Sequence, residues 1–229
     1  MSFPSIALAA TWNPRGETRR LELLLERLRW AYTGIYISLS PLPDDPASQT
    51  ELLDRLAGDK LKCQVNPDWS WGRYTAVQMA LSSGAPWIHY VDLDRLLRWV
   101  EGQPDEWAQT LSAIQGSDYL VIGRTKAAYA THPQALVQTE ALSNTVISFL
   151  VGQQMDVSAG SKGFSRQAAS YVIENTMPGH ALGTDGEWTV LLHRAGFKLG
   201  YIEVNGLDWE SADRYQNRAA DPTRQRQAA

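Results

Sequence analysis

The chain has 229 residues, 44% of them hydrophobic and 20% charged, as in an ordinary soluble globular protein with a sizeable core. A formal net charge of −4 gives no electrostatic reason to expect nucleic acid as a partner. The single cysteine, Cys63, excludes an internal disulfide and a multi-cysteine zinc site. No stretch approaches the roughly 20 apolar residues of a membrane span, and no basic segment precedes the first apolar run. We therefore expect a cytoplasmic protein without an integral membrane segment.

The first half of the chain predicts strands that alternate with helices. The apolar run 5–11 is expected to be a buried strand. After it, leucines recur at positions 21, 24, 25 and 28, which is the spacing of an amphipathic helix that Gly34 ends. Further strands are expected over 35–40, 61–65 and 87–92, helices over 49–57 and 71–86, and a proline-rich loop over 41–48.

The second half continues the alternation. Helices are expected over 105–115, about 133–151, 166–175 and 185–195, and strands over 118–125 and 198–204. Residues 155–165 are expected to form a strand followed by a glycine-bearing loop. The pattern predicts one α/β domain over 1–217, with a mostly parallel sheet flanked by helices, and a disordered tail over 218–229.

Two carboxylates close the most strand-like segment, in the stretch HYVDLD. Asp92 and Asp94 would point the same way in an extended strand, roughly 7 Å apart. Mg²⁺ or Mn²⁺ prefers oxygen ligands and often takes one or two carboxylates together with phosphate oxygens. In open α/β sheets, ligands bind beyond the carboxyl ends of the strands. The pair therefore indicates a divalent cation that would hold a diphosphate, with Thr11 and Asn13 at the end of another strand.

Simpler interpretations of this pair remain open. Asp92 could merely end its strand, and Asp94 could cap a helix that starts at Arg95. Asp94 could also pair with Arg98, four residues further on.

The order of the parts adds a family resemblance. The strand ending in AATWNPRGE, the helix carrying Gly72 and Arg73, the segment WIHYVDLD, then DVSAGSKGFSRQAA and GTDGEWTVLLHRAGFKLGYIEV, follow one another over residues 5–210. This order resembles a GT-A-fold glycosyltransferase of the family-2 type and its polyprenyl-phosphate sugar-transferring relatives. The resemblance implies the nucleotide-diphospho-sugar transferase fold, a nucleotide-diphospho-sugar donor, an unidentified acceptor, and Mn²⁺ or Mg²⁺ as the cofactor.

The resemblance also assigns roles to residues. Asp92 and Asp94 would bind the metal, and Asp185 and Glu187 match the acidic pair from which an inverting enzyme draws its base. The donor-binding positions are Thr11, Trp12, Asn13, Asp44 (a loose match), Arg73, Asp92, Asp94, Lys162 and Gly163, the last two within the turn 160–164.

Three of these assignments have alternatives. Asp185 is favoured as the base because it precedes the helix and can face the cleft. Thr184 and Glu187 could instead form a capping box at that helix. His180 could be a third metal ligand or only a solvated loop histidine.

Two other functions compete with sugar transfer. One is a nucleotidyltransferase of similar topology, although such enzymes usually carry a glycine-rich basic loop after the first strand, where AATWNPRGETRR has one glycine. The other is a catalytically inactive GT-A-like protein that binds a nucleotide or a partner.

Overall fold

The computed structural model describes residues 6–14, 17–41, 51, 53, 54, 56, 58, 60–179 and 183–209. The proline-rich loop, apart from residue 41, and the expected tail lie outside these residues. The helix expected over 49–57 is described only at 51, 53, 54 and 56, which are helical.

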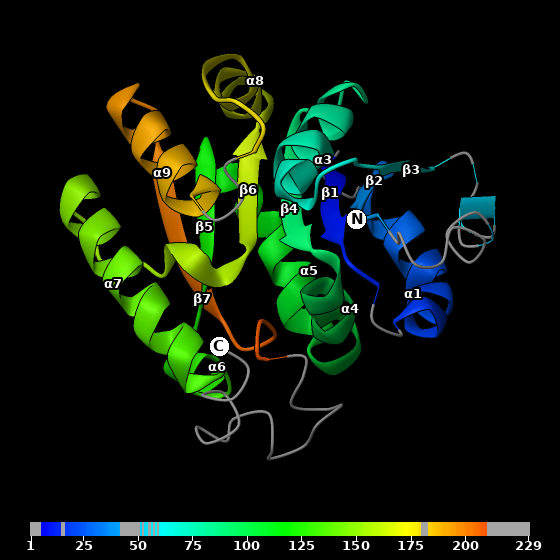
Figure 1. Cartoon of the computed structure of the whole chain (residues 1–229), viewed down its shortest axis with the longest axis horizontal. Coiled ribbons are helices and arrows are strands. Elements are labelled where there is room, and N and C mark those ends of the chain that lie inside the picture. The colour runs from blue at the N-terminus through cyan, green and yellow to red at the C-terminus, as the bar shows by residue number, and fades with distance from the viewer. Residues whose placement is uncertain are drawn as a thin grey trace.

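Seven strands form one sheet in the order β3-β2-β1-β4-β6-β5-β7 (Figure 1). Only β6 runs antiparallel to its neighbours. The strands are β1 (Ile6–Trp12), β2 (Gly34–Leu39), β3 (Leu61–Val65), β4 (Trp87–Asp92), β5 (Tyr119–Arg124), β6 (Ser161–Ser165) and β7 (Leu199–Val204). The other six strands therefore end at the same edge of the sheet, and their carboxyl ends can build one site.

Helices cover both faces of the sheet. One core cluster packs α1 (Thr18–Ala31), α4 (Leu93–Gly102) and α5 (Pro104–Ala113) on one face. The other packs α3 (Gly72–Leu81), α8 (Arg166–Asn175) and α9 (Thr184–Arg194), with α7 (Gln134–Val151) beside them, on the opposite face. The short pieces are η1 (Trp69–Trp71), η2 (Ile114–Gly116), α6 (Lys126–Ala130) and η3 (Val157–Ala159). Figure 1 shows α7 and α1 at opposite ends of the sheet.

Side-chain alternation explains why the sheet is covered on both sides. In β1, Leu8 and Ala10 belong to the first cluster, while Ala7 and Ala9 belong to the second. Successive strand residues point to opposite faces, so a strand buried on both faces is apolar throughout. This is why an unbroken apolar run predicted β1 correctly.

The predicted α/β class and mostly parallel sheet are confirmed. One segment is wrong: residues 155–165 form η3 first and β6 afterwards, so the loop precedes the strand. The glycine responsible is Gly160, whose positive φ of 70° turns the chain just before β6. In the part of the chain that the structure describes, no helix is both long and apolar enough to cross a membrane.

Candidate functional site

A cavity of about 330 Å³ opens at the carboxyl ends of β1, β2 and β4. The segments that line it are far apart in sequence, from the end of β1 to the loop after β7. Its lining is Thr11, Trp12, Asn13, Ser40, Trp69, Arg73, Asp92, Asp94, Arg95 and Trp209. Six of these residues were predicted to bind a donor, so the structure brings most of that set to one place.

Asp92 is fixed by its neighbours in the sheet. It pairs in register with Thr11, and its backbone N–H donates to the carbonyl of Gly160 at 3.1 Å. One carboxylate oxygen, Oδ1, accepts from Thr11 Oγ1 at 2.9 Å and from the Tyr90 hydroxyl at 2.6 Å. The other oxygen, Oδ2, lies 3.6 Å from Nη2 of Arg73. With 29% of its side chain exposed, Asp92 is a preorganised acceptor at the cavity wall.

Asp94 reaches the same cavity in a different way from the one predicted. The strand ends at Asp92 and α4 begins at Leu93, so the pair is not extended. Asp94 lies in the first turn of α4, where the helix dipole favours a negative charge. It does not cap a helix at Arg95, because α4 has already begun at Leu93. Arg98, the other partner considered for it, forms an ion pair with Asp208 through two hydrogen bonds.

The charge of Asp94 is poorly compensated. Burial raises the pKa of its carboxyl group, and the neighbouring Asp92 raises it further, against the lowering effect of Arg95. Arg95 itself donates to the backbone carbonyl of Asp208 at 2.9 Å and stacks over the Trp209 ring at 4.3 Å. A cation placed between Asp92 and Asp94 would supply the missing compensation.

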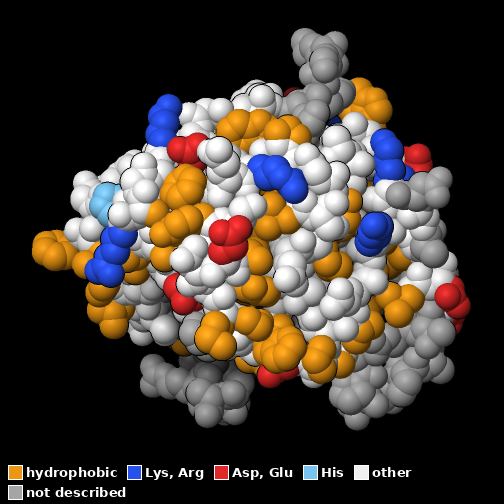
Figure 2. All heavy atoms as spheres, turned by 90° about the horizontal axis from the view of Figure 1, so that it is seen from above, with side chains coloured by type: hydrophobic (Ala, Val, Ile, Leu, Met, Phe, Trp, Pro, Cys, Tyr) orange, Lys and Arg blue, Asp and Glu red, His pale blue; other side chains and the backbone are white. Residues whose placement is uncertain are grey.

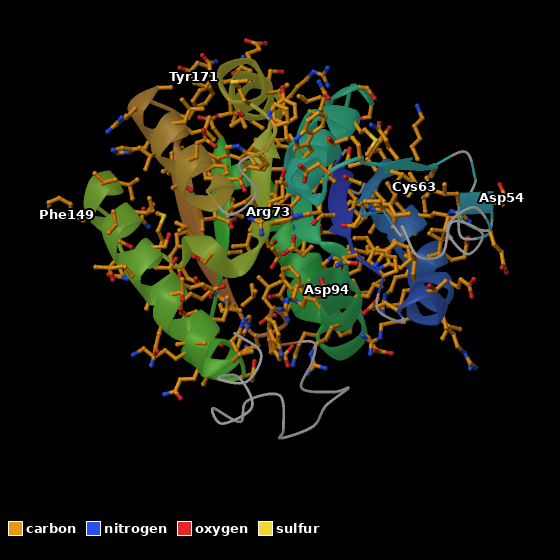
Figure 3. The ribbon with its side chains drawn as sticks, viewed as in Figure 1. Asp54, Cys63, Arg73, Asp94, Phe149 and Tyr171 are labelled. Carbon is orange, nitrogen blue, oxygen red and sulfur yellow. The ribbon has the colours of Figure 1, made fainter. Side chains whose placement is uncertain are left out.

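Arg73 links the acidic pair to Asp185. Its guanidinium forms an ion pair with Asp185, donates to Thr184 Oγ1 at 3.3 Å, and lies 5.8 Å from the centre of the Tyr90 ring. Burial opposes its charge, but Asp185, Tyr90 and Asp92 outweigh burial and raise the pKa of Arg73. Arg73 therefore stays charged and holds the carboxylates of Asp92 and Asp185 at once. Figure 3 labels Arg73 together with Asp94, which lines the same cavity.

Asp185 has a second cationic partner in Lys162. The Lys162 ammonium lies 3.2 Å from Asp185 Oδ1 and donates to the Val157 carbonyl at 2.7 Å. Burial alone would raise the pKa of Asp185, but Arg73 and Lys162 lower it. Asp185 is thus a half-buried, ionised carboxylate that Arg73 connects to the cavity, with 15% of its side chain exposed.

The capping box at this helix is not formed. The N-cap of α9 is Gly183, which provides no side-chain cap. The backbone N–H of Glu187 donates to the Gly183 carbonyl at 2.8 Å, and the Thr184 hydroxyl accepts from Arg73. Glu187 is half-buried in the first turn of α9 and is not among the residues that line the cavity.

Two predicted donor-binding residues lie elsewhere. Lys162 is 1% exposed, and its ammonium binds Asp185 and the Val157 carbonyl inside the protein, so it does not line the cavity. Gly163 lies within β6 between His89 and Leu120, where a Cβ atom would come within 2.8 Å of Ile114. The glycine that adjoins the site is Gly160, where a Cβ atom would lie 2.5 Å from Asp92 Oδ2.

Asp44 and His180 lie outside the described residues. Sequence reasoning missed four members of the site: Ser40, Trp69, Tyr90 and Arg95. Tyr90 could have been found, because strand residues two apart point to the same face. Trp69 comes from the connection between β3 and α3, whose course the sequence pattern does not specify.

The donor set fits a divalent cation only in part. Among the described residues, no three His, Cys, Asp or Glu side chains gather into a metal site. Asp92 and Asp94 do line one cavity, and Asp92 Oδ2 accepts no short hydrogen bond from a described residue. The two carboxylates therefore fit Mg²⁺ or Mn²⁺ if ligand oxygens complete the coordination.

Comparison with known proteins shows the fold. No family model and no curated protein matches this sequence. The structure is similar to 4-diphosphocytidyl-2C-methyl-D-erythritol synthase from Anaerococcus prevotii, with a TM-score of 0.51 and 10% identity over 90% of this chain and 91% of that chain. The nucleotide-diphospho-sugar transferase-like fold is thereby confirmed, and at 10% identity the likeness shows the fold alone.

Proposed function

We propose that this chain is a nucleotide-dependent transferase, and that it moves a sugar from a nucleotide-diphosphate donor to an acceptor. The observation that carries the proposal is the convergence of Thr11, Trp12, Asn13, Arg73, Asp92 and Asp94 on one cavity at the carboxyl edge of the sheet. Ligands of open α/β sheets bind at this edge.

Each group has a role in that reaction. Asp92 and Asp94 would hold Mg²⁺ or Mn²⁺, which when bound offsets the charge that develops on a leaving diphosphate. Thr11, Trp12 and Asn13 would contact the nucleoside. Arg73, already charged at the cavity wall, would contact the diphosphate oxygens.

Asp185 is the favoured base for the acceptor hydroxyl. It is ionised, but Arg73 and Lys162 reduce its basicity. Because Arg73 also faces the cavity, a diphosphate there would compete with Asp185 for the guanidinium. Weakening the Arg73–Asp185 pair would raise the pKa of Asp185 and make it a stronger base when the donor is bound.

A nucleotidyltransferase is the second candidate. It is favoured by the fold neighbour, whose name describes the synthesis of a diphosphocytidyl compound. The same acidic pair and Arg73 could hold a nucleoside triphosphate. The two reactions break different bonds: sugar transfer releases a nucleoside diphosphate, whereas nucleotidyl transfer releases pyrophosphate.

Product analysis separates the candidates. The full chain is incubated with Mn²⁺ or Mg²⁺ and either UDP- and GDP-sugars or CTP and UTP, and the phosphorus-containing products are followed by ³¹P NMR. Slow hydrolysis of a sugar nucleotide to a nucleoside diphosphate supports sugar transfer. Release of pyrophosphate supports nucleotidyl transfer. Tight metal-dependent binding without turnover of any of these compounds would favour a nucleotide-binding protein, and the absence of binding would contradict the proposal.

A further inference from the structure

Helix α7 (Gln134–Val151) buries polar side chains and exposes large apolar ones. Its two most buried residues are polar: Asn144 donates to Asp156 Oδ1 at 2.7 Å, and Ser148 exchanges hydrogen bonds with the backbone of Met155. Large apolar side chains point outward instead. They are Leu142, Val146, Phe149 and Leu150, exposed by 70%, 48%, 85% and 45%.

These four residues, called here the outer α7 face, form one continuous stripe. Their spacing of i, i+4, i+7 and i+8 places them on the same side of the helix. Figure 3 shows Phe149 pointing away from the rest of the molecule, and in Figure 2 hydrophobic side chains extend to the left margin, where Figure 1 places the end of α7. Scattered apolar residues on a surface are normal, but a contiguous stripe marks an interaction site.

The outer α7 face carries no charge. Glu140 is the only charged residue between 134 and 151, and it turns inward to pair with Arg124 Nη2 at 2.7 Å. In a two-fold interface each patch meets its own copy, so a charge near the axis would meet a like charge. An uncharged stripe avoids this repulsion.

We propose that the outer α7 face binds the same face of a second copy of this chain, with the two helices antiparallel. A two-fold axis at Val146 places residue 146+n opposite residue 146−n, so Leu142 of one copy meets Leu150 of the other. Phe149, three residues after the axis, then meets the small residue Ser143 of the second copy, three residues before it. Large against small is the complementarity that close packing requires.

The size of this face suits a weak, reversible dimer. At 1.5 Å per residue, the 18 residues of α7 span about 27 Å. From their exposed fractions, the four apolar side chains would bury roughly 400–500 Å² per copy, so the total of roughly 800–1,000 Å² lies at the lower end for specific interfaces.

Other occupants fit less well. Helices that lie on membranes usually carry Lys and Arg on their polar face, and nucleic acid also requires basic residues. Helix α7 contains neither Lys nor Arg.

Sedimentation velocity on the full chain over a range of concentrations tests the proposal. We expect a concentration-dependent dimer that is lost in Leu142→Glu and in Phe149→Glu. The control is Leu23→Glu on α1, which is 74% exposed and lies outside this face, and which should dimerise like the parent chain. Circular dichroism confirms that each variant is folded.

Cross-linking with a short bis-maleimide tests the register in a Cys63→Ser background. Val146→Cys should cross-link to itself, and a mixture of Leu142→Cys with Leu150→Cys should give the mixed product. Ala135→Cys alone should not, because antiparallel helices would separate the two sites by roughly 33 Å. Three results would overturn the proposal. The parent chain could stay monomeric at all concentrations, or the dimer could persist in Leu142→Glu. The third result is a monomer that floats with phosphatidylcholine vesicles.

Discussion

The contact between Gly160 and Asp92 yields the sharpest prediction. Gly160 has a positive φ of 70°, and a Cβ atom there would lie 2.5 Å from Asp92 Oδ2. Gly152 has nearly the same backbone, with φ of 72°, but its Cβ would meet nothing within 4 Å. The substitutions Gly160→Ala and Gly152→Ala therefore impose the same backbone strain, and only the first disturbs the acidic pair.

The expected magnitudes follow from this difference. Placing alanine in the left-handed region costs about 1–2 kcal/mol at either position. At Gly160 the methyl group must also push aside the Asp92 carboxylate, which is held by Thr11 and Tyr90. Losing one hydrogen bond to a charged group costs roughly 2 kcal/mol more. The free energy of unfolding should fall by about 1–2 kcal/mol in Gly152→Ala and by about 3–4 kcal/mol in Gly160→Ala.

Urea denaturation and nucleotide titration check both parts. Gly160→Ala should also weaken metal-dependent nucleotide binding at least about tenfold, the equivalent of about 1.4 kcal/mol, whereas Gly152→Ala should leave it unchanged. Equal destabilisation of the two variants together with equal nucleotide affinity would refute the placement of Asp92 against Gly160.

Three further predictions concern titratable groups that are buried, as His89 and Lys162 are, or half-buried, as Cys63 is. Burial lowers the pKa of His89 to about 3, so below pH 6.5 the unfolded chain binds a proton that the folded chain does not bind. The free energy of unfolding should therefore fall from pH 6.5 toward pH 3, by about 2 kcal/mol at pH 5. Urea titrations should show that His89→Gln removes this part of the loss. Lys162→Met should lower the free energy of unfolding by about 3 kcal/mol in urea, because Asp185 loses a buried partner; a change below 1 kcal/mol would contradict the Lys162–Asp185 pair. Burial raises the pKa of the Cys63 thiol to about 12, so iodoacetamide at pH 8 should modify the folded chain at least about 100-fold more slowly than the urea-unfolded chain.

The sequence predicted the parts of the fold that depend on local pattern. Strand β1 opens with an unbroken apolar run over residues 6–10, and the leucines of α1 recur at helical spacing, so period and composition were sufficient. The order of η3 and β6 was wrong because the apolar residues of 155–165 surround a turn at Gly160, which local hydrophobicity does not reveal.

The sequence indicated the position of the candidate residues that follow a strand. Thr11 and Asp92 end adjacent parallel strands, which the carboxyl-edge rule anticipates. The sequence did not indicate the positions of Lys162 and Gly163, because their contacts with Asp185 and Ile114 are decided by tertiary packing. The Arg73–Asp185 pair joins residues 112 positions apart, and no sequence period indicates such a contact.

The acidic pair also shows the limit of spacing arguments. Asp92 and Asp94 were expected to share one strand face, yet they belong to a strand end and a helix start. Both still line the cavity, because the chain turns between them. The expected local conformation was therefore incorrect, although both carboxylates reach the same cavity.

The most direct test is isothermal titration calorimetry with UDP, GDP, CDP and CTP, each with and without Mn²⁺. The titrations are made into the parent chain, into Asp92→Asn and into the control Asp208→Asn. Asp208 suits the control because its carboxylate pairs with Arg98 and does not line this cavity. We expect that one nucleotide binds only in the presence of the metal, that Asp92→Asn abolishes this metal dependence, and that Asp208→Asn retains it. Binding by Asp92→Asn that keeps the full metal dependence, or no binding of any nucleotide by the parent chain, would contradict a nucleotide site at the acidic pair.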